Sequence, residues 1–225
     1  MEPSFWQERW QKNEIGFHLP CVHPLLEKYL PALGLDEGAI LFLPLCGRTL
    51  DIGYLRSLEN RVIGVELSEL AVKGVFEQLG VTPEVRPWRG GQCWRADGVT
   101  IFQGDFFQLQ ADDLGAVDAI YDRAALVALP PDMRERYAAH LLEISYAAPQ
   151  LLISFEYDQS RMPGPPFSVP TEEVAGLYGD FYELHEFSRQ DVISKAPRFA
   201  EQGLASFVEV AWHLRPEITR PDAPS

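Results

Sequence analysis

The residues best suited to chemistry are an acid and a turn. Glu66 follows the apolar run 62–65, and the turn 44–47 follows the apolar run 39–43. An acid about twenty residues after such a turn is typical of a nucleoside site, in which the carboxylate binds the hydroxyls of a ribose. The turn reads Pro-Leu-Cys-Gly and lacks the Gly-x-Gly-x-x-Gly pattern of dinucleotide sites. The sequence therefore predicts a nucleoside ligand without a pyrophosphate.

Two more polar residues follow apolar runs. Asp105 comes after the run 99–103, and Arg123 comes after the run 117–121. Asp105 is either the N-cap of the next turn or a hydrogen-bonding partner of a nucleobase, which Phe106 would cover. Arg123 is either a partner in a simple ion pair or a ligand contact at the same edge. Its position among strand ends favours the ligand contact.

Two later segments can approach the same edge. The stretch 161–170 is rich in proline and follows the apolar run 151–155, so we expect an irregular loop on the substrate side. Lys195 and Arg198 lie in the segment 191–203, where each either extends over the edge or is solvated. From the residues alone, solvation is favoured for both.

The cysteines predict neither a metal site nor a disulfide framework. Cys21, Cys46 and Cys93 are widely spaced, their number is odd and no Cys-x-x-Cys pair occurs. Cys46 lies in the turn, but it has apolar neighbours and no evident histidine partner. We therefore interpret it as a buried thiol rather than a nucleophile. This cysteine content fits a reducing cytoplasm.

The elements that position these residues begin with a βαβ unit. The runs 39–43 and 62–65 are continuously apolar, as parallel strands covered on both faces are, and a crossover helix fits between them. The turn and the acid then lie at the carboxyl edge of the sheet, where open α/β sheets bind ligands. Further strands are predicted at 99–103, 117–121 and 151–155, with antiparallel strands at 181–187 and 205–212.

We expect a single domain spanning all 225 residues. Residues 1–35 are predicted to be a helical cap over the site, in which Trp6 and Trp10 either pack on the core or cover a ligand. The segment 82–98 has no periodicity and is predicted to be a loop or an irregular hairpin. The end of the chain, 216–225, is predicted to be a loose tail.

The composition of the chain restricts the classes of molecule that it can bind. A formal net charge of −14 argues against binding to nucleic acid or to an anionic membrane, both of which require clustered Lys and Arg. The charged and aromatic N-terminus is unlike a signal peptide, and no segment is apolar enough to span a bilayer. We expect a cytoplasmic protein, monomeric in solution, that acts on a small molecule.

Five alternations of strand and helix followed by an antiparallel hairpin are the topology of class I S-adenosylmethionine-dependent methyltransferases. Spacing alone also allows a dehydrogenase or another nucleoside-binding α/β protein. A closer comparison comes from the motifs, because the chain resembles the thiopurine S-methyltransferase family, in order, over nearly its whole length. The stretches concerned are FWQERWQKNEIGFH, LFLPLCGRTLDIGYL, VIGVELSELAV, GDFF, YDRAALVALPPDMRERYA and PRFAEQG.

The resemblance implies an α/β, Rossmann-like fold with a mostly parallel seven-stranded sheet, a C-terminal antiparallel hairpin and helices on both faces. It implies S-adenosyl-L-methionine as methyl donor and S-adenosyl-L-homocysteine as product. Phe17 would contact an aromatic substrate, and Arg123 and Arg198 would lie near a thiopurine ring. The residues that would bind the donor are Trp10, Leu45, Glu66, Asp105, Phe106 and Arg123.

The implied reaction is methylation of the sulfur of aromatic or heterocyclic thiols such as thiopurines. Such thiols lose their proton near neutral pH, so no strong base and no metal are needed. We hypothesise that Arg123 and Arg198 are catalytic and favour the thiolate by donating hydrogen bonds to ring nitrogens, directly or through water.

The sequence also allows other methyl acceptors and a non-catalytic function. The resemblance extends to bacterial members linked to methylation of selenium or tellurium species. One alternative is a methyltransferase of the same fold that acts on a halide, thiocyanate or another acceptor. The other is a non-catalytic cofactor-binding protein, against which the presence of Trp10, Glu66 and Arg123 argues.

Overall fold

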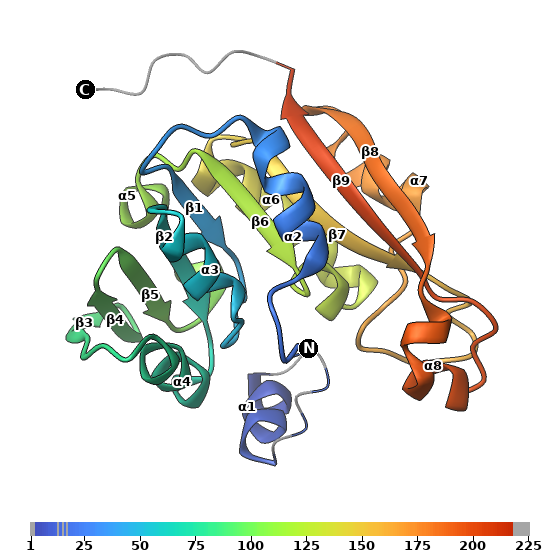
Figure 1. Cartoon of the computed structure of the whole chain (residues 1–225), viewed down its shortest axis with the longest axis horizontal. Helices are drawn as coiled ribbons and strands as arrows, with labels where there is room; N and C mark the ends of the chain where they lie inside the picture. The colour runs from blue at the N-terminus through green and yellow to red at the C-terminus, as the bar shows by residue number, and fades with distance from the viewer. Residues whose placement is uncertain (1–2, 13, 15, 17, 218–225) are drawn as a thin grey trace.

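The computed structural model describes residues 3–12, 14, 16 and 18–217, which form a mixed sheet with helices on both faces (Figure 1). Within this part of the chain the sheet has nine strands in the order β3-β4-β5-β2-β1-β6-β7-β9-β8. The strands are β1 (Ile40–Leu43), β2 (Arg61–Glu66), β3 (Glu84–Trp88), β4 (Gly91–Ala96), β5 (Val99–Gln103), β6 (Ala119–Arg123), β7 (Gln150–Glu156), β8 (Tyr182–Asp191) and β9 (Val208–Pro216).

The helices divide between the two faces of the sheet. Helices α2 to α4 cover one face, where Leu26, Ile52 and Phe76 are buried. On the other face, Leu141 of α6 and Val174 of α7 are buried. The helices are α1 (Pro3–Gln11), α2 (Pro24–Tyr29), α3 (Asp51–Ser57), α4 (Glu69–Leu79), α5 (Ala111–Leu114), α6 (Pro131–Ser145), α7 (Thr171–Tyr178) and α8 (Pro197–Glu201), with short 3₁₀ helices η1 (Leu30–Leu33), η2 (Phe106–Gln108), η3 (Leu126–Ala128) and η4 (Ile193–Lys195).

The predicted βαβ unit is confirmed as β1, α3 and β2, with β1 and β2 parallel. Strands β5, β2, β1, β6 and β7 are parallel neighbours, and the chain proceeds outward from β1 on one side and from β6 on the other. The strand order therefore reverses between β1 and β6, and a crevice opens beyond their carboxyl ends. Figure 1 shows α1 and α8 beyond this same edge.

The prediction of seven strands is wrong, because the segment 82–98 adds a regular hairpin to one side of the sheet. Strands β3 and β4 are antiparallel to each other, and β4 continues onto β5. The hairpin lacks apolar periodicity because β3 is an edge strand that is mostly exposed and tolerates Pro87, which has no N–H. The other seven strands have the predicted parallel core and antiparallel C-terminal pair.

Several boundaries also differ from prediction. The antiparallel strands predicted at 181–187 and 205–212 run over Tyr182–Asp191 and Val208–Pro216. Strand β6 begins two residues later than the predicted 117–121, because the Asp118 carboxylate and N–H bind the backbone of Ile40 before the strand begins, and it continues to Arg123. At the other end, Pro216 belongs to β9 and the N–H of Glu217 donates to the carbonyl of Phe181 at 3.2 Å. Residues 218–225 of the predicted tail lie outside the described residues.

Gly64 of β2 makes room for the turn that follows β1. A Cβ on Gly64 would lie 2.8 Å from Sγ of Cys46, which is itself buried. We expect Gly64→Ala to lower the free energy of unfolding by about 1–3 kcal/mol, as overpacking of a core does. Denaturation in urea measures this change.

A variant at Cys46, the residue that the new Cβ would meet, is the control for this prediction. In a Cys46→Ala background the sulfur is gone, so Gly64→Ala should be tolerated better than in the wild type. An equal loss in both backgrounds would show that this contact is not the cause. Gly176→Ala in α7, where a Cβ meets nothing within 4 Å, should not destabilise the protein.

Candidate functional site

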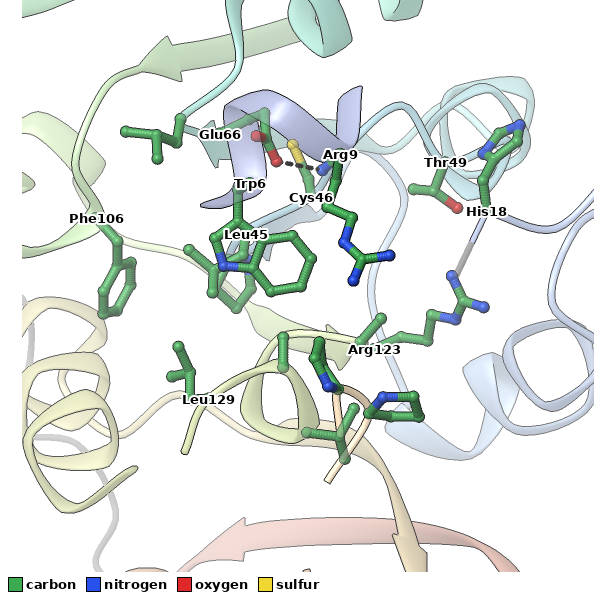
Figure 2. A pocket seen from close by; sticks show the side chains of 18 of the residues that line it. Trp6, Arg9, His18, Leu45, Cys46, Thr49, Glu66, Phe106, Arg123 and Leu129 are labelled. Carbon is green, nitrogen blue, oxygen red and sulfur yellow. Dashed lines mark hydrogen bonds between the residues drawn. The ribbon is translucent and has the colours of Figure 1, made fainter. Parts of the chain in front are cut away.

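A cavity of about 520 Å³ lies beyond the carboxyl ends of the central strands. Its walls come from the turn after β1, the ends of β2, β5 and β6, the helices α1 and α8, and the loop at Pro165 and Pro166. The predicted site residues that line it are Trp10, Leu45, Glu66, Asp105, Phe106, Arg123 and Arg198. Figure 2 shows Leu45, Glu66, Phe106 and Arg123 around one space, into which Trp6 and Arg9 project from α1.

Glu66 is a buried carboxylate held by backbone donors. It ends β2, where Oε2 accepts from the N–H of Gly47 and Oε1 accepts from the N–H of Ser68, both at 2.8 Å. Burial raises the pKa of Glu66, and these backbone donors oppose that rise. A carboxylate oxygen offers two acceptor positions, so each can still receive a hydrogen bond from a ligand.

The turn after β1 brings backbone toward the cavity. Leu45 and Gly47 both have positive φ, 46° and 56°, and the N–H of Cys46 donates to the carbonyl of Val65 at 3.0 Å. The thiol of Cys46 is buried, and burial followed by the charge of Glu66 raises its pKa well above the ordinary value. Cys46 is therefore a protonated packing residue, as expected from the sequence, and the half-buried Leu45 lines the cavity beside it.

At Asp105 the structure shows the capping interaction. Its Oδ1 accepts from the N–H of Phe107 at 3.0 Å at the start of η2, and its side chain also lines the cavity. Phe106 is buried, with its ring 4.9 Å from that of Tyr137. A ligand at this end therefore meets an apolar wall beside a carboxylate.

Arg123 enters the cavity because of a bend at the end of β6. It is the last residue of the strand, and Ala124 after it has a φ of 63°. The Nε of Arg123 is buried and has no hydrogen-bond partner within the described residues. A buried unsatisfied donor beside a cavity indicates a polar ligand.

Asp122 lies behind Arg123 and fixes this bend. It is fully buried, with Oδ1 accepting from the N–H of Leu126 at 3.1 Å and Oδ2 accepting from the hydroxyl of Tyr137 at 2.7 Å. Burial raises the pKa of Asp122 to about 6, and both hydrogen bonds oppose that rise. The carboxylate therefore holds together the turn, α6 and, through Tyr137, the ring of Phe106.

This raised pKa predicts a pH dependence of stability. Because the pKa is higher in the folded than in the unfolded chain, the contribution of Asp122 to stability is complete below about pH 4 and is lost as the pH rises through about 6. Asp122→Asn should therefore become more stable relative to the wild type by a few kcal/mol between pH 4 and 7. Urea denaturation across this range measures the difference, and a constant difference would contradict the assignment.

Several functional candidates were not predicted from the sequence. Arg48 lies next to Gly47, with its guanidinium 5.7 Å from the ring of Trp10 and its Nε buried without a partner in the described chain. Its place directly after the turn was the signal that could have identified it. His18 also lines the cavity, and its pKa is lowered by burial and then by Arg48 and Arg123.

The N-terminal and C-terminal parts of the chain meet at the mouth of the cavity. Arg198 of α8 is exposed, and its Nη1 donates to the carbonyl of Gly16. Arg198 thus lines the cavity although solvation was favoured from the residues alone, whereas Lys195 in η4 is not a lining residue. Phe17, the predicted substrate contact, lies outside the described residues.

The residues of this cavity fit a nucleoside that carries an amino acid. Glu66 offers acceptors to a ribose, Phe106 offers an apolar surface to a base, and Arg123 offers an unsatisfied donor to a carboxylate. The volume lies within the range of about 300–1,000 Å³ that is typical of small-molecule sites.

The described residues contain neither a cluster of metal ligands nor a helix suited to span a membrane. No group of three or more His, Cys, Asp or Glu side chains there could hold a metal ion. In the same part of the chain, no helix is both long enough and apolar enough to cross a membrane.

Solved structures share the fold. An S-adenosylmethionine-dependent methyltransferase from Thiobacillus denitrificans, in complex with S-adenosyl-L-homocysteine, is 16% identical, with a TM-score of 0.64 and coverage of 93% of this chain and 98% of that one. Magnesium protoporphyrin IX methyltransferase from Synechocystis PCC 6803 is 14% identical, with a TM-score of 0.62 and coverage of 95% and 100%. These similarities confirm a Rossmann-like methyltransferase fold.

Proteins related by sequence have a much higher identity to this chain than these solved structures do. A thiopurine S-methyltransferase of Pseudomonas aeruginosa (strain LESB58) is 44% identical over 215 residues, covering 95% of this chain and 99% of the relative. One from Xanthobacter autotrophicus (strain ATCC BAA-1158 / Py2) is 53% identical over 183 residues, covering 81% and 86%. The family model described as Thiopurine S-methyltransferase (TPMT) matches residues 1–217. The chain therefore belongs to the thiopurine S-methyltransferase family, whose enzymes use S-adenosyl-L-methionine as methyl donor.

Proposed function

We propose that the chain transfers the methyl group of S-adenosyl-L-methionine to the sulfur of aromatic or heterocyclic thiols such as thiopurines. The observation that carries this proposal is one cavity with an anchored carboxylate, Glu66, at one end and the cations Arg123 and Arg198 at the other. Trp10, Leu45, Asp105 and Phe106 would complete the donor site.

The donor supplies a methyl group on a positively charged sulfur, and the chain's own residues hold the acceptor in line with it. Proximity and orientation provide most of the rate enhancement in such a displacement. Trp6 and Trp10 of α1, together with Pro165 and Pro166, keep water from the reacting atoms. Arg123 and Arg198 stabilise the thiolate by offering N–H donors, so the acceptor is bound in its reactive form.

The test is an assay with 6-mercaptopurine, thiophenol, thiocyanate and iodide as acceptors, with products identified by mass spectrometry. We expect S-methyl products from the two aromatic thiols. Binding of S-adenosyl-L-homocysteine without turnover of any acceptor would favour the non-catalytic alternative. Turnover of the inorganic anions alone would favour the other methyltransferase alternative.

We also propose a cytoplasmic, single-domain monomer. The three cysteines are free, and the large exposed apolar side chains are scattered over different elements, as Leu58, Leu70, Tyr146 and Phe181 show for the described residues. Light scattering tests the oligomeric state.

Selenite and tellurite in the methyl-transfer assay test whether selenium or tellurium species are acceptors. Growth of expressing cells in the presence of these two anions tests whether the protein confers metalloid resistance.

A further inference from the structure

One end of the cavity holds more positive charge than the composition of the chain would suggest. Arg48, Arg123 and Arg198 line it, and among the described residues none of the three forms an ion pair with a carboxylate. The whole chain has 33 acidic and only 19 basic residues, so acidic partners are not scarce. We refer to these three residues as the arginine cluster.

The members of the arginine cluster lie close enough to influence the same groups. Arg48 and Arg123 both lower the pKa of His18, after the larger effect of its burial. Arg123 likewise lowers the pKa of Arg198, again after burial. Arg123 therefore acts on the same imidazole as Arg48 and on the guanidinium of Arg198, all in one part of the cavity.

The acids that line the cavity are already engaged. The carboxylate of Asp51 accepts from the N–H of His23 and from the hydroxyl of Tyr121, and its charge raises the pKa of His18 against the larger effects of burial and the two arginines. The other three acids bind other groups. Glu14 forms an ion pair with Arg9, Glu66 accepts from the N–H groups of Gly47 and Ser68, and Asp105 accepts from the N–H of Phe107. A ligand must therefore bring the negative charge that the arginine cluster lacks.

The methyl donor does not bring enough negative charge to neutralise the arginine cluster. On the proposed function, it carries one carboxylate but two positive groups, a sulfonium and an ammonium, so its net charge is positive. Its carboxylate can satisfy one guanidinium, and the thiolate that attacks the methyl carbon can satisfy another, which leaves the third without a counter-ion. Cations without counter-ions in a partly desolvated site are unfavourable, so a further anion on the acceptor would be bound strongly.

We propose that the arginine cluster binds an ionised carboxylate on the acceptor, so that the preferred substrates are aromatic thiols that also carry a carboxylate. Arg48 is the specificity-determining member. Its side chain is held between Trp10, 5.7 Å from the guanidinium, and Gly74 of α4, where a Cβ would lie 3.1 Å from Cδ of Arg48. A guanidinium fixed in this way binds a planar carboxylate through two parallel hydrogen bonds with little loss of entropy.

The test compares 4-mercaptobenzoate with its neutral analogue 4-mercaptobenzamide at pH 8.5, where both thiols are ionised. We expect kcat/KM to be at least about tenfold higher for the benzoate, and the preference to shrink as NaCl is raised. Arg48→Gln and Arg198→Gln should each reduce the preference to about threefold or less. Arg215→Gln, which removes a surface ion pair with Glu183 on β8, is the matched control and should keep it.

Three results would overturn the inference or its basis. Equal kcat/KM for the two thiols would reject the inference but leave the proposed function intact. A preference that survives both Arg48→Gln and Arg198→Gln, together with weaker binding of S-adenosyl-L-homocysteine in calorimetry, would assign these arginines to the donor instead. Methylation of neither thiol by a protein that binds S-adenosyl-L-homocysteine would reject the proposed function itself.

Discussion

Replacing Glu66 by alanine is expected to weaken the binding of S-adenosyl-L-homocysteine at least about a hundredfold in isothermal titration calorimetry. The carboxylate is anchored by the N–H groups of Gly47 and Ser68, so its free acceptor positions are aimed at the cavity before a ligand arrives. Hydrogen bonds to an ionised group contribute about 1.5–3 kcal/mol each, and a ribose diol forms two. A factor of a hundred corresponds to about 2.7 kcal/mol.

The alanine variant also leaves two backbone donors without their partner, so its fold must be checked by thermal unfolding. Glu66→Gln is the second variant, because its amide keeps one acceptor oxygen for the turn but loses the charge. Glu69→Ala is the matched control, since Glu69 lies only three residues further on and is paired with Lys73 on the exposed side of α4. Unchanged donor affinity in both Glu66 variants would reject the ribose assignment.

The pKa of Glu66 gives this prediction a pH dependence. Burial raises that pKa, so the carboxylate becomes protonated at a higher pH than an ordinary glutamate does. Donor affinity of the wild type should therefore fall on acidification, beginning above the usual range of a glutamate. In Glu66→Gln the same titration should show a smaller dependence on pH.

The parallel core could be predicted from the sequence because its strands are buried on both faces. The run at β5 was predicted with its observed bounds, and both the acid at Glu66 and the turn at Leu45 were placed at the correct edge. The ends of α4 carry local signals of the same kind, because the Ser68 hydroxyl accepts from the N–H of Ala71 and Gly80 has a positive φ. Each of these signals is local and depends on few neighbours.

The errors arise where distant residues satisfy a local irregularity. Asp122 reads as the end of a strand, but its buried carboxylate is bound by Leu126 and Tyr137, so β6 continues to Arg123. Pro87 reads as a loop, but an edge strand needs no N–H on its outer side. For Asp122 the compensating partner Tyr137 lies 15 positions later, outside the sequence window that suggested the boundary.

The acceptor end of the cavity was the least predictable part. Arg198 lines it from α8, where its guanidinium donates to the carbonyl of Gly16, a residue 182 positions earlier. Arg48 and His18 lie next to recognisable motifs, but an arginine after a turn and a histidine after a glycine-aromatic pair are ordinary on a surface. Only the fold shows that they share a cavity with Arg123.

Replacing Arg123 by methionine is expected to lower kcat/KM for a thiopurine by at least about a hundredfold. Its Nε is buried without a partner in the described residues, and the bend at Ala124 aims the side chain into the cavity. Removing one preorganised donor to a developing or bound anion typically costs about 2.7–4 kcal/mol. Methionine keeps much of the volume, so the loss should not reflect a collapsed wall.

The pH dependence of kcat/KM distinguishes a role of Arg123 in binding the acceptor from a role in binding the donor. If Arg123 stabilises the thiolate, the apparent pKa in kcat/KM should rise in Arg123→Met, and part of the lost activity should return above that pKa. Arg123→Lys keeps the charge but not the planar fork, so it should restore the pKa more than the rate. Arg215→Met controls for loss of a surface charge. An unchanged profile with weaker binding of S-adenosyl-L-homocysteine would instead show that Arg123 serves the donor alone, because only the cofactor step would then depend on its charge.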